Sequence, residues 1–163
     1  MNLRVAAGSA FIFFVLIISF FVMRDWAFNK MVNSLISTNI GVIKPVDVNL
    51  SKTIILDTRE KIEYDISHLP GAIWVGYEDF DLNRVKANKK DDILVYCSIG
   101  KRSNDIALKL QSEGFSDVKN LHGGIFKWVN ENYVVVNQSG NTNKVHTYSM
   151  SWSIWLKNGE GVN

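Results

Sequence analysis

The sequence predicts an α/β domain in which a mostly parallel sheet is flanked by helices, preceded by one transmembrane helix. Three observations lead to this prediction. From Pro45 onwards, short β-branched and apolar runs alternate with segments of helical periodicity. One of these runs, Asp92–Cys97, is apolar almost throughout, as expected of a strand buried on both faces. A long run without any charged residue, Val5–Met23, stands near the N-terminus.

The length and charge of the chain limit its organisation. The 163 residues, with a net charge of +2, suit one modest domain and an appendage. Basic and acidic residues are mixed along the chain, whereas nucleic-acid binding would favour a clustered basic face, so we expect no nucleic-acid partner. We divide the chain into four parts: an anchor at 1–25, a linker at 26–44, a globular domain at 45–138 and a C-terminal extension at 139–163.

Residues 5–23 are long enough to cross a bilayer core of about 30 Å as a helix. The competing interpretation is a cleaved signal peptide, whose apolar region is about 7–15 residues long and is followed by small residues. Here the run is longer and continues into "RDWAFNK", so we expect an uncleaved membrane anchor. The positive charges before and after the apolar run are nearly equal in number, so they do not determine the orientation of the helix in the membrane. We place the domain outside the cytoplasm, on the periplasmic side, because anchors of this kind often deliver the following domain across the membrane.

The linker and the domain divide into elements by their periodicity. The first part of the linker, Trp26–Ile36, is suited to prolong the N-terminal helix. Strands are predicted within residues 53–59, 71–77, 92–97 and 117–121. A helix is predicted over 103–115, with Ile106, Ala107 and Leu110 on one face and Gly114 as its stop, and a second one over 123–132.

The C-terminal extension has aromatic and apolar residues at three- and four-residue steps: Val145, Tyr148, Trp152 and Trp155. We interpret this spacing as an amphipathic helix. The stripe is expected either to pack on the domain or to meet a membrane surface, and ordinary core packing is favoured because aromatic stripes are usually buried. The alternation of Val145 and Thr147 leaves a strand as an alternative.

Cys97 is the only cysteine, which excludes an intrachain disulfide and a cysteine-rich zinc site. A lone cysteine is most often a small buried hydrophobe. Here, however, it ends a predicted strand and leads into the loop "SIGKR" before a predicted helix. In open α/β sheets, ligands bind at such places, beyond the carboxyl ends of the strands.

The loop after Cys97 is suited to hold an anion. Its backbone amides and the following helix N-terminus form an anion cradle, and Gly100 allows a tight turn. Lys101 and Arg102 add positive charge, and Arg102 offers a planar fork of donors. A helix N-terminus and nearby cations also favour the thiolate, the form in which cysteine is a nucleophile. The sequence therefore predicts a sulfur nucleophile beside an anion site.

Four segments resemble rhodanese-like sulfurtransferases in the same order. "CSIGKRS" resembles their active-site loop, "ILDTRE" and "ISHLPGAIWV" their first signature, and "HGGIFKW" the pattern near their domain end. The resemblance covers about Val46–Asn137. Besides the loop, the positions that match are Asp57, Arg59, Glu63, His68, Gly71, Ala72, Gly123, Gly124 and Trp128.

The resemblance implies a rhodanese-like fold with a five-stranded, mostly parallel sheet. It implies that Cys97 is the catalytic residue and carries a sulfane sulfur as a persulfide. The anion and persulfide are held by the loop residues Ser98, Ile99, Gly100, Lys101, Arg102 and Ser103. Asp57, Arg59 and His68 are implied to be structural supports near the site. Ser67 stands where many members have glycine, so that turn is expected to have a slightly different backbone.

The expected partners are a small anionic sulfur donor resembling thiosulfate and a thiol or cyanide acceptor, with a protein as a further acceptor. No cofactor and no metal is expected. Two alternatives stay open. A phosphatase of the dual-specificity type would have five residues between its cysteine and arginine, whereas four separate Cys97 from Arg102. A non-catalytic, membrane-tethered module for binding or sulfur sensing is the other.

Overall fold

The computed structural model describes residues 3–37 and 39–163, without the side chains of residues 3–12, 21 and 150. Its centre is a sheet of five strands: β1 (Gly41–Ile43), β2 (Ile54–Asp57), β3 (Ile73–Trp74), β4 (Ile93–Tyr96) and β5 (Val118–Leu121). Their order is β1-β5-β4-β2-β3, and each neighbouring pair is parallel. The predicted five-stranded parallel sheet is therefore confirmed, and its central strand β4 is buried at all four positions.

Helices cover both faces of this sheet. They are α2 (Lys61–Ile66), α3 (Lys101–Ser112) and α4 (Gly124–Asn130), and two short 3-10 turns stand at Pro45–Asp47 and Leu82–Arg84. Side chains alternate along β4, so Val95 packs with α3 while Leu94 packs with α4. The predicted face of α3 is buried, and Gly114, at φ 88°, follows the helix as its stop.

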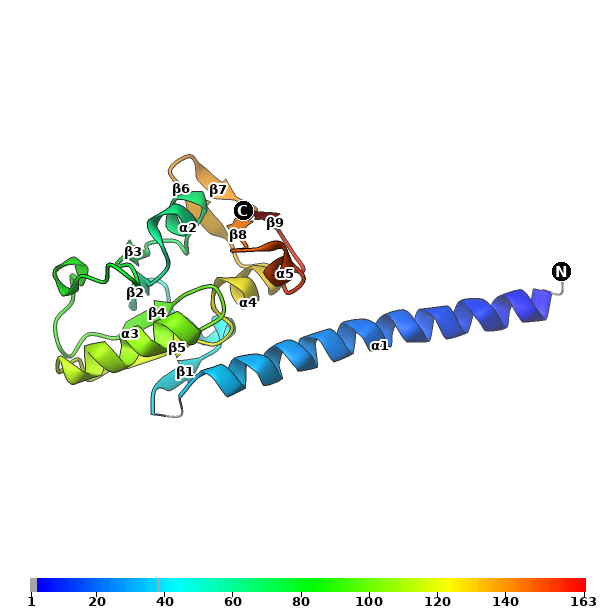
Figure 1. The fold of residues 1–163 in the computed structure, drawn as a ribbon, viewed down its shortest axis with the longest axis horizontal. Coiled ribbons are helices and arrows are strands. Elements are labelled where there is room, and N and C mark those ends of the chain that lie inside the picture. The colour runs from blue at the N-terminus through cyan, green and yellow to red at the C-terminus, as the bar shows by residue number, and fades with distance from the viewer. Residues whose placement is uncertain (1–2, 38) are drawn as a thin grey trace.

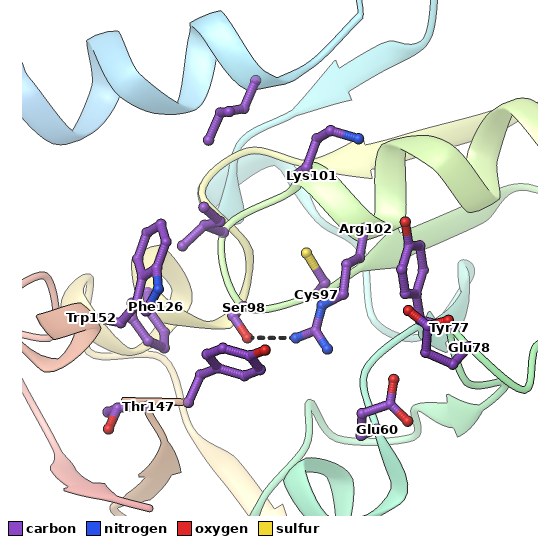
Figure 2. Close-up of a pocket in the computed structure, with 13 residues that line it drawn as sticks. Glu60, Tyr77, Glu78, Cys97, Ser98, Lys101, Arg102, Phe126, Thr147 and Trp152 are labelled. Atoms are coloured by element: carbon purple, nitrogen blue, oxygen red, sulfur yellow. Dashed lines mark hydrogen bonds between the residues drawn. The ribbon is translucent and has the colours of Figure 1, made fainter. Parts of the chain in front are cut away.

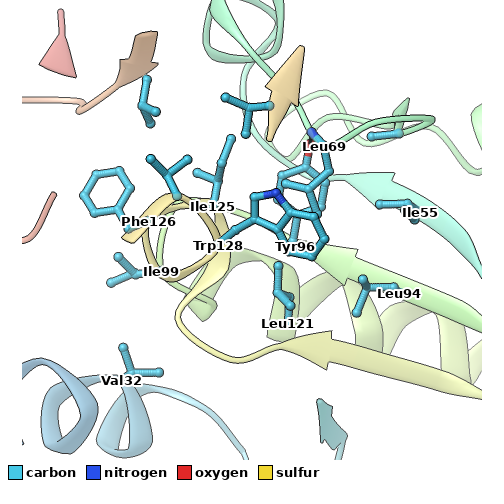
Figure 3. Packing of buried hydrophobic residues seen from close by; sticks show 14 of the residues in the cluster. Val32, Ile55, Leu69, Leu94, Tyr96, Ile99, Leu121, Ile125, Phe126 and Trp128 are labelled. Atoms are coloured by element: carbon cyan, nitrogen blue, oxygen red, sulfur yellow. Dashed lines mark hydrogen bonds between the residues drawn. The ribbon is translucent and has the colours of Figure 1, made fainter. Parts of the chain in front are cut away.

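A single long helix, α1 (Leu3–Leu35), precedes the sheet and extends away from the rest of the molecule (Figure 1). Its last turns pack into the core, where Phe28 is 7% exposed and Val32 is fully buried. Figure 3 shows Val32 on the same side of the sheet as Ile125 and Phe126 of α4. The expectation that the N-terminal helix continues through Trp26–Ile36 is confirmed to Leu35.

The membrane anchor predicted at Val5–Met23 is not supported. Among the residues that the structure describes, no helix combines the length and hydropathy needed to cross a bilayer. The side chains of residues 5–12 and 21, which belong to the predicted segment, lie outside the described residues. The periplasmic placement followed from the anchor and is not supported either.

The described residues of the predicted linker, 26–37 and 39–44, belong in large part to the domain. Besides the end of α1 it contains β1, which pairs with β5 in register from Gly41 to Ile43. The sequence signal for β1 is weak because this edge strand has three residues, of which two are exposed. The segment therefore adds both a helix and a strand to the fold.

The C-terminal extension is not the predicted amphipathic helix. After the antiparallel pair of β6 (Val135–Asn137) and β7 (Gly140–Thr142) come β8 (Lys144–His146), the short α5 (Met150–Ser153) and β9 (Glu160–Val162). β8 and β9 pair in parallel, and Tyr148 has φ 65°, which interrupts any helix. The helical spacing of the aromatic residues arises from packing, since Trp152 and Trp155 both pack on the core around α4.

Candidate active site

Cys97 follows directly after β4 and lies at the carboxyl edge of the sheet. Its residue is 1% exposed, and its Sγ accepts a hydrogen bond from the Gly100 amide at 3.1 Å. Gly100 can turn its amide back towards the sulfur because it adopts φ 112°, a conformation that favours glycine. The same residue caps α3, so the sulfur lies at the N-terminal end of that helix.

The first turn of α4, which begins at Gly124, fixes the other side of the loop. The carbonyls of Cys97 and Ser98 accept hydrogen bonds from the amides of Ile125 (2.9 Å) and Phe126 (3.2 Å). This contact requires Gly124, since a Cβ there would lie 2.2 Å from the Cys97 carbonyl oxygen. The loop carbonyls thus point to α4, which leaves the Gly100 amide to face the thiol.

Ser103 closes the loop from beneath instead of lining the cavity. Its hydroxyl donates to Asn120 Oδ1 at 2.7 Å, and the Asn120 amide donates to the Gly100 carbonyl at 2.8 Å. Both side chains are buried. Ser103, which was predicted to bind the anion, instead links α3 to β5 through its hydrogen bond to Asn120.

Arg102 is held by a buried carboxylate that the loop motif does not contain. Its Nη1 and Nη2 donate to Glu63 Oε2 and Oε1 at 2.7 and 2.9 Å, and Nη2 also donates to Ser98 Oγ at 3.0 Å. Burial would raise the pKa of Glu63, but the hydrogen bonds and charge of Arg102, helped by Arg59, hold it below its usual range. Burial conversely opposes the charge of Arg102, and Glu63 raises the pKa of Arg102 despite it.

Lys101 is likewise paired inside the protein. Its Nζ donates to Asp105 Oδ2 at 2.6 Å, and this hydrogen bond raises the pKa of Lys101. The Tyr77 hydroxyl donates to the same carboxylate at 3.1 Å, which raises the pKa of Tyr77. Both cations of the loop therefore have a carboxylate partner, and neither presents an uncompensated charge to the cavity.

Asp57 and Arg59 form a fully buried ion pair below the sheet edge. Arg59 Nη2 lies 2.6 Å from Asp57 Oδ2 and also donates to the Ser67 carbonyl. Tyr96, on β4, donates its hydroxyl to the same Asp57 oxygen. The pair thus ties β2, β4 and the end of α2 together and lies outside the cavity lining, a position that fits the support role expected for both residues.

His68 lies on the α2 side and also supports the fold. Its ring stacks on Tyr64, with centroids 3.9 Å apart, and its Nδ1 lies 2.9 Å from the Tyr64 carbonyl. Its backbone forms a bridge with Val136 of β6. The sequence places this residue near the site, and the structure shows it joining α2 to the segment after the sheet.

A cavity of about 530 Å³ opens above the thiol. In Figure 2 the Cys97 sulfur lies between Phe126 and Trp152 on one side and Tyr77 and Arg102 on the other. Of the predicted loop, the lining includes Cys97, Ser98, Ile99, Lys101 and Arg102, and the remaining lining residues are Leu35, Glu60, Tyr77, Glu78, Phe126, Thr147, Tyr148 and Trp152.

The lining residues missed by the sequence analysis come mostly from outside the recognised motifs. Leu35 belongs to α1, and Thr147, Tyr148 and Trp152 belong to the C-terminal extension. The aromatic stripe of the extension was a signal that these residues pack on the domain, but nothing in it indicates which surface they meet. Among the described residues, no group of three His, Cys, Asp or Glu side chains is placed to hold a metal ion.

Comparison with known families decides the classification. The model of the rhodanese-like domain family matches residues 44–131, more than half of the chain. The chain belongs to the rhodanese-like domain family. This rhodanese-like domain includes Cys97, its loop and the two glycines at the start of α4, and it ends before β6.

Curated relatives match a stretch of similar length but are much longer proteins. The tRNA uridine(34) hydroxylase of Bacillus cytotoxicus is 42% identical over 80 residues, which is 45% of this chain and 25% of that protein. The enzyme of the same name from Streptococcus pyogenes is 40% identical over 79 residues, or 45% and 24%. The chain thus spans about a quarter of the length of the curated relatives that it matches.

Solved structures share the fold of the rhodanese-like domain. A Bacillus halodurans protein superimposes with a TM-score of 0.53 and 26% identity, covering 61% of this chain and 79% of that one. A rhodanese-related protein of Thermoplasma volcanium gives a TM-score of 0.50 and 26% identity, covering 59% and 97%. That second protein is almost fully covered, whereas about two fifths of this chain lie outside the superposition.

Proposed function

We propose that the protein is a sulfurtransferase that carries sulfane sulfur as a persulfide on Cys97. The observation that supports this most is the position of the sulfur. The sulfur accepts a hydrogen bond from the Gly100 amide at 3.1 Å, lies at the N-terminal end of α3 and lines an open cavity. An amide and a helix N-terminus stabilise negative charge on sulfur, both in the thiolate and in the persulfide.

The reaction has two displacement steps at sulfur. The Cys97 thiolate attacks the outer sulfur of the donor, the donor's sulfur–sulfur bond breaks, and its leaving group departs with the electron pair, as sulfite does from thiosulfate. The acceptor then attacks the outer sulfur of the persulfide. Cyanide leaves as thiocyanate, a thiol leaves as a persulfide, and the Cys97 thiolate is restored. The chain supplies the nucleophile and stabilises its charge.

The proposal also includes the class of sulfur donor and the class of sulfur acceptor. A small anionic sulfur compound such as thiosulfate is the simplest donor, and a thiol or cyanide is the simplest acceptor. A protein thiol is a further acceptor in this proposal.

The phosphatase alternative is disfavoured by the arginine. A dual-specificity phosphatase has five residues between its cysteine and its arginine, whereas four separate Cys97 from Arg102, and Arg102 is also paired with Glu63. A non-catalytic role in binding or sulfur sensing remains the competing function, and the test below separates it.

The test uses the full chain, because the end of α1 belongs to the core. The protein is incubated with thiosulfate and its intact mass is measured before and after cyanide is added, with Cys97→Ser as the control. We expect one added sulfur atom on the wild type only, and its release as thiocyanate. A folded wild type that gains no sulfur from thiosulfate, from a thiosulfonate or from glutathione persulfide would reject the catalytic proposal in favour of a binding module.

A further inference from the structure

One wall of the cavity is built by residues outside the family-matched region. Trp152 and Tyr148 come from the C-terminal extension and Leu35 from the end of α1, whereas the match covers residues 44–131. Together with Ile99 and Phe126 they make one side of the cavity apolar. Figure 2 shows Trp152 and Phe126 on the same side of the Cys97 sulfur, and both line the cavity.

Tyr148 is held in a costly conformation at the edge of this wall. Its φ of 65° is rare for a residue with a side chain, and its side chain is 68% exposed although it is large. The Tyr148 amide donates to His146 Nδ1 at 3.1 Å, and the preceding Thr147 amide donates to the Val162 carbonyl at 2.8 Å. Two hydrogen bonds thus hold the backbone while the aromatic ring stays largely exposed, an arrangement that suits contact with a ligand.

The extension that carries the wall is tied firmly to α4. Asn130, at the end of α4, donates to the Trp155 carbonyl at 2.8 Å and accepts the Lys157 amide at 2.6 Å. The Trp155 ring lies 5.7 Å from the ring of Phe28, a buried residue of α1. The wall is therefore a fixed part of the cavity, so the shape and polarity that it gives to the site are present before any ligand binds.

The charges around the cavity disfavour a small dianion. Lys101 and Arg102 are each paired with a carboxylate, Asp105 and Glu63. The lining contributes two further acidic side chains, Glu60 and Glu78. A cavity of about 530 Å³ lies in the usual range for organic ligands, and a bare thiosulfate ion would leave most of it, including the aromatic wall, unused.

From these observations we infer that the C-terminal extension selects the sulfur donor, and that this donor is an organic sulfane-sulfur compound with an apolar or aromatic group. This inference rests on the proposed sulfurtransferase function. The organic group lies against Tyr148 and Trp152, while the single negative charge of the reacting end lies at the Cys97 loop. The Cys97 thiolate attacks the terminal sulfur of a donor R–SO₂–S⁻, the bond between the two sulfurs breaks, and the sulfinate R–SO₂⁻ leaves with the electron pair.

The test compares two donors that differ only in the group R. Benzenethiosulfonate and methanethiosulfonate have the same charge and the same reacting atoms. The rate constant for persulfide formation on Cys97 is measured for each, and their ratio is divided by the ratio found with free cysteine in the same buffer. That division removes the intrinsic difference between the two leaving groups. For the wild type we expect a preference of about tenfold for the aromatic donor, the contribution of one aromatic contact.

Two variants locate the source of the preference. Tyr148→Ala and Trp152→Ala should each lower the corrected preference for the aromatic donor to about threefold. Tyr148 is exposed, so its variant is expected to fold, and a thermal unfolding curve verifies this. The matched control is Ile154→Ala, which removes another exposed apolar side chain of the extension that does not line the cavity, and should keep the full preference.

The outcomes separate the inference from the function beneath it. Sulfur transfer with a corrected ratio near one in the wild type, or a ratio that Tyr148→Ala and Trp152→Ala both leave intact, overturns the inference and leaves the sulfurtransferase in place. Failure of every donor, thiosulfate included, overturns the proposed function and the inference with it.

Discussion

Residues 44–131 and the segments that flank them contribute different features to one cavity. The matched region provides Cys97, the loop and the helices that hold it, whereas the flanking segments, 25–43 and 132–163, provide Leu35, Thr147, Tyr148 and Trp152. The matched region contributes the reactive thiol, whereas the residues from the flanking segments contribute mainly contact surface to the cavity lining. The comparison teaches that the shape of the cavity can change through the flanks while the Cys97 loop stays the same.

Both regions contribute fully buried side chains to the same core. Val32 and Val145, from the two flanking segments, are as fully buried as Leu121 of β5, and all three belong to one hydrophobic cluster. The flanking segments are therefore part of the folding unit, and the hydrophobic core extends beyond the family-matched residues 44–131. The largest predicted effect follows from this.

Phe28→Ala should lower the free energy of unfolding by about 3–5 kcal/mol, because it leaves a void in the core. The side chain is 7% exposed, packs against Trp155 and lies outside the matched region. Urea denaturation of the full chain measures the change. Phe14→Ala removes an equal side chain from the projecting part of the same helix, where it is 60% exposed, and should alter stability by less than about 0.5 kcal/mol. Equal effects of the two substitutions would show that the docked end of α1 is not part of the core.

Gly124→Ala tests the contact between the matched region's own helix and loop. We expect the free energy of unfolding to fall by more than about 2 kcal/mol and persulfide formation to slow markedly. The new Cβ would lie only 2.2 Å from the Cys97 carbonyl oxygen, which must move away, and the φ of 55° is unfavourable for alanine. Gly114→Ala is the matched control. It has a similar φ of 88° but open space around the new Cβ, so it should cost only about 1–2 kcal/mol and leave the reaction rate intact.

Glu63→Gln should change which anion the site accepts. Without the carboxylate, the charge of Arg102 is no longer compensated, so the rate ratio of thiosulfate to methanethiosulfonate should rise by about three- to tenfold. Competition between the two donors measures this ratio. Glu113→Gln makes the same change of charge at the opposite end of α3 and should have no effect on it. An unchanged ratio in Glu63→Gln would mean that the pairing of Arg102 does not determine donor charge.

The smallest predicted effect concerns pH and the flanking residue His146. Burial lowers the pKa of His146 although Glu63, 4.0 Å away, opposes this, and burial together with Lys127 and Lys44 lowers the pKa of His122. Both imidazoles thus take up protons more readily in the unfolded chain. Stability should be fully present above about pH 6.5 and fall as the pH drops below that value.

His146→Gln should reduce this pH dependence by less than about 1 kcal/mol, since the ring is partly solvated, and the remainder should come from His122. Thermal unfolding between about pH 5 and pH 8 measures it. A variant whose stability falls with pH as steeply as that of the wild type would show that His146 does not contribute.

The sequence was most informative where local pattern and chemistry coincide. The apolar run of β4, the amphipathic face of α3 and the loop after Cys97 predicted the sheet, its cover and the position of the thiol. Glu63 was matched as a family position, but its bidentate hold on Arg102 was not foreseen, because the two residues are 39 positions apart. Local periodicity has no information on such pairings.

The flanking segments were the least predictable part for a related reason. The spacing of Tyr148, Trp152 and Trp155 imitates a helix, but the backbone turns at Tyr148, just after β8, and ends in β9, which pairs in parallel with β8. The apolar run at residues 5–23 led to an anchor that the described residues do not support. In both cases composition indicated an apolar surface correctly, while the element that presents it depends on contacts distant in the sequence.

The contact between α1 and the C-terminal extension has a consequence for synthesis on the ribosome. Asp25 pairs with Lys157, 132 positions later, and the buried ring of Phe28 meets Trp155. During translation the side of α1 that carries Phe28 therefore lacks its contact with Trp155 until the extension has emerged from the ribosome. A pause in elongation just before residue 155 would prolong the exposure of that face, and recruitment of chaperones to the nascent chain should be greatest at this stage.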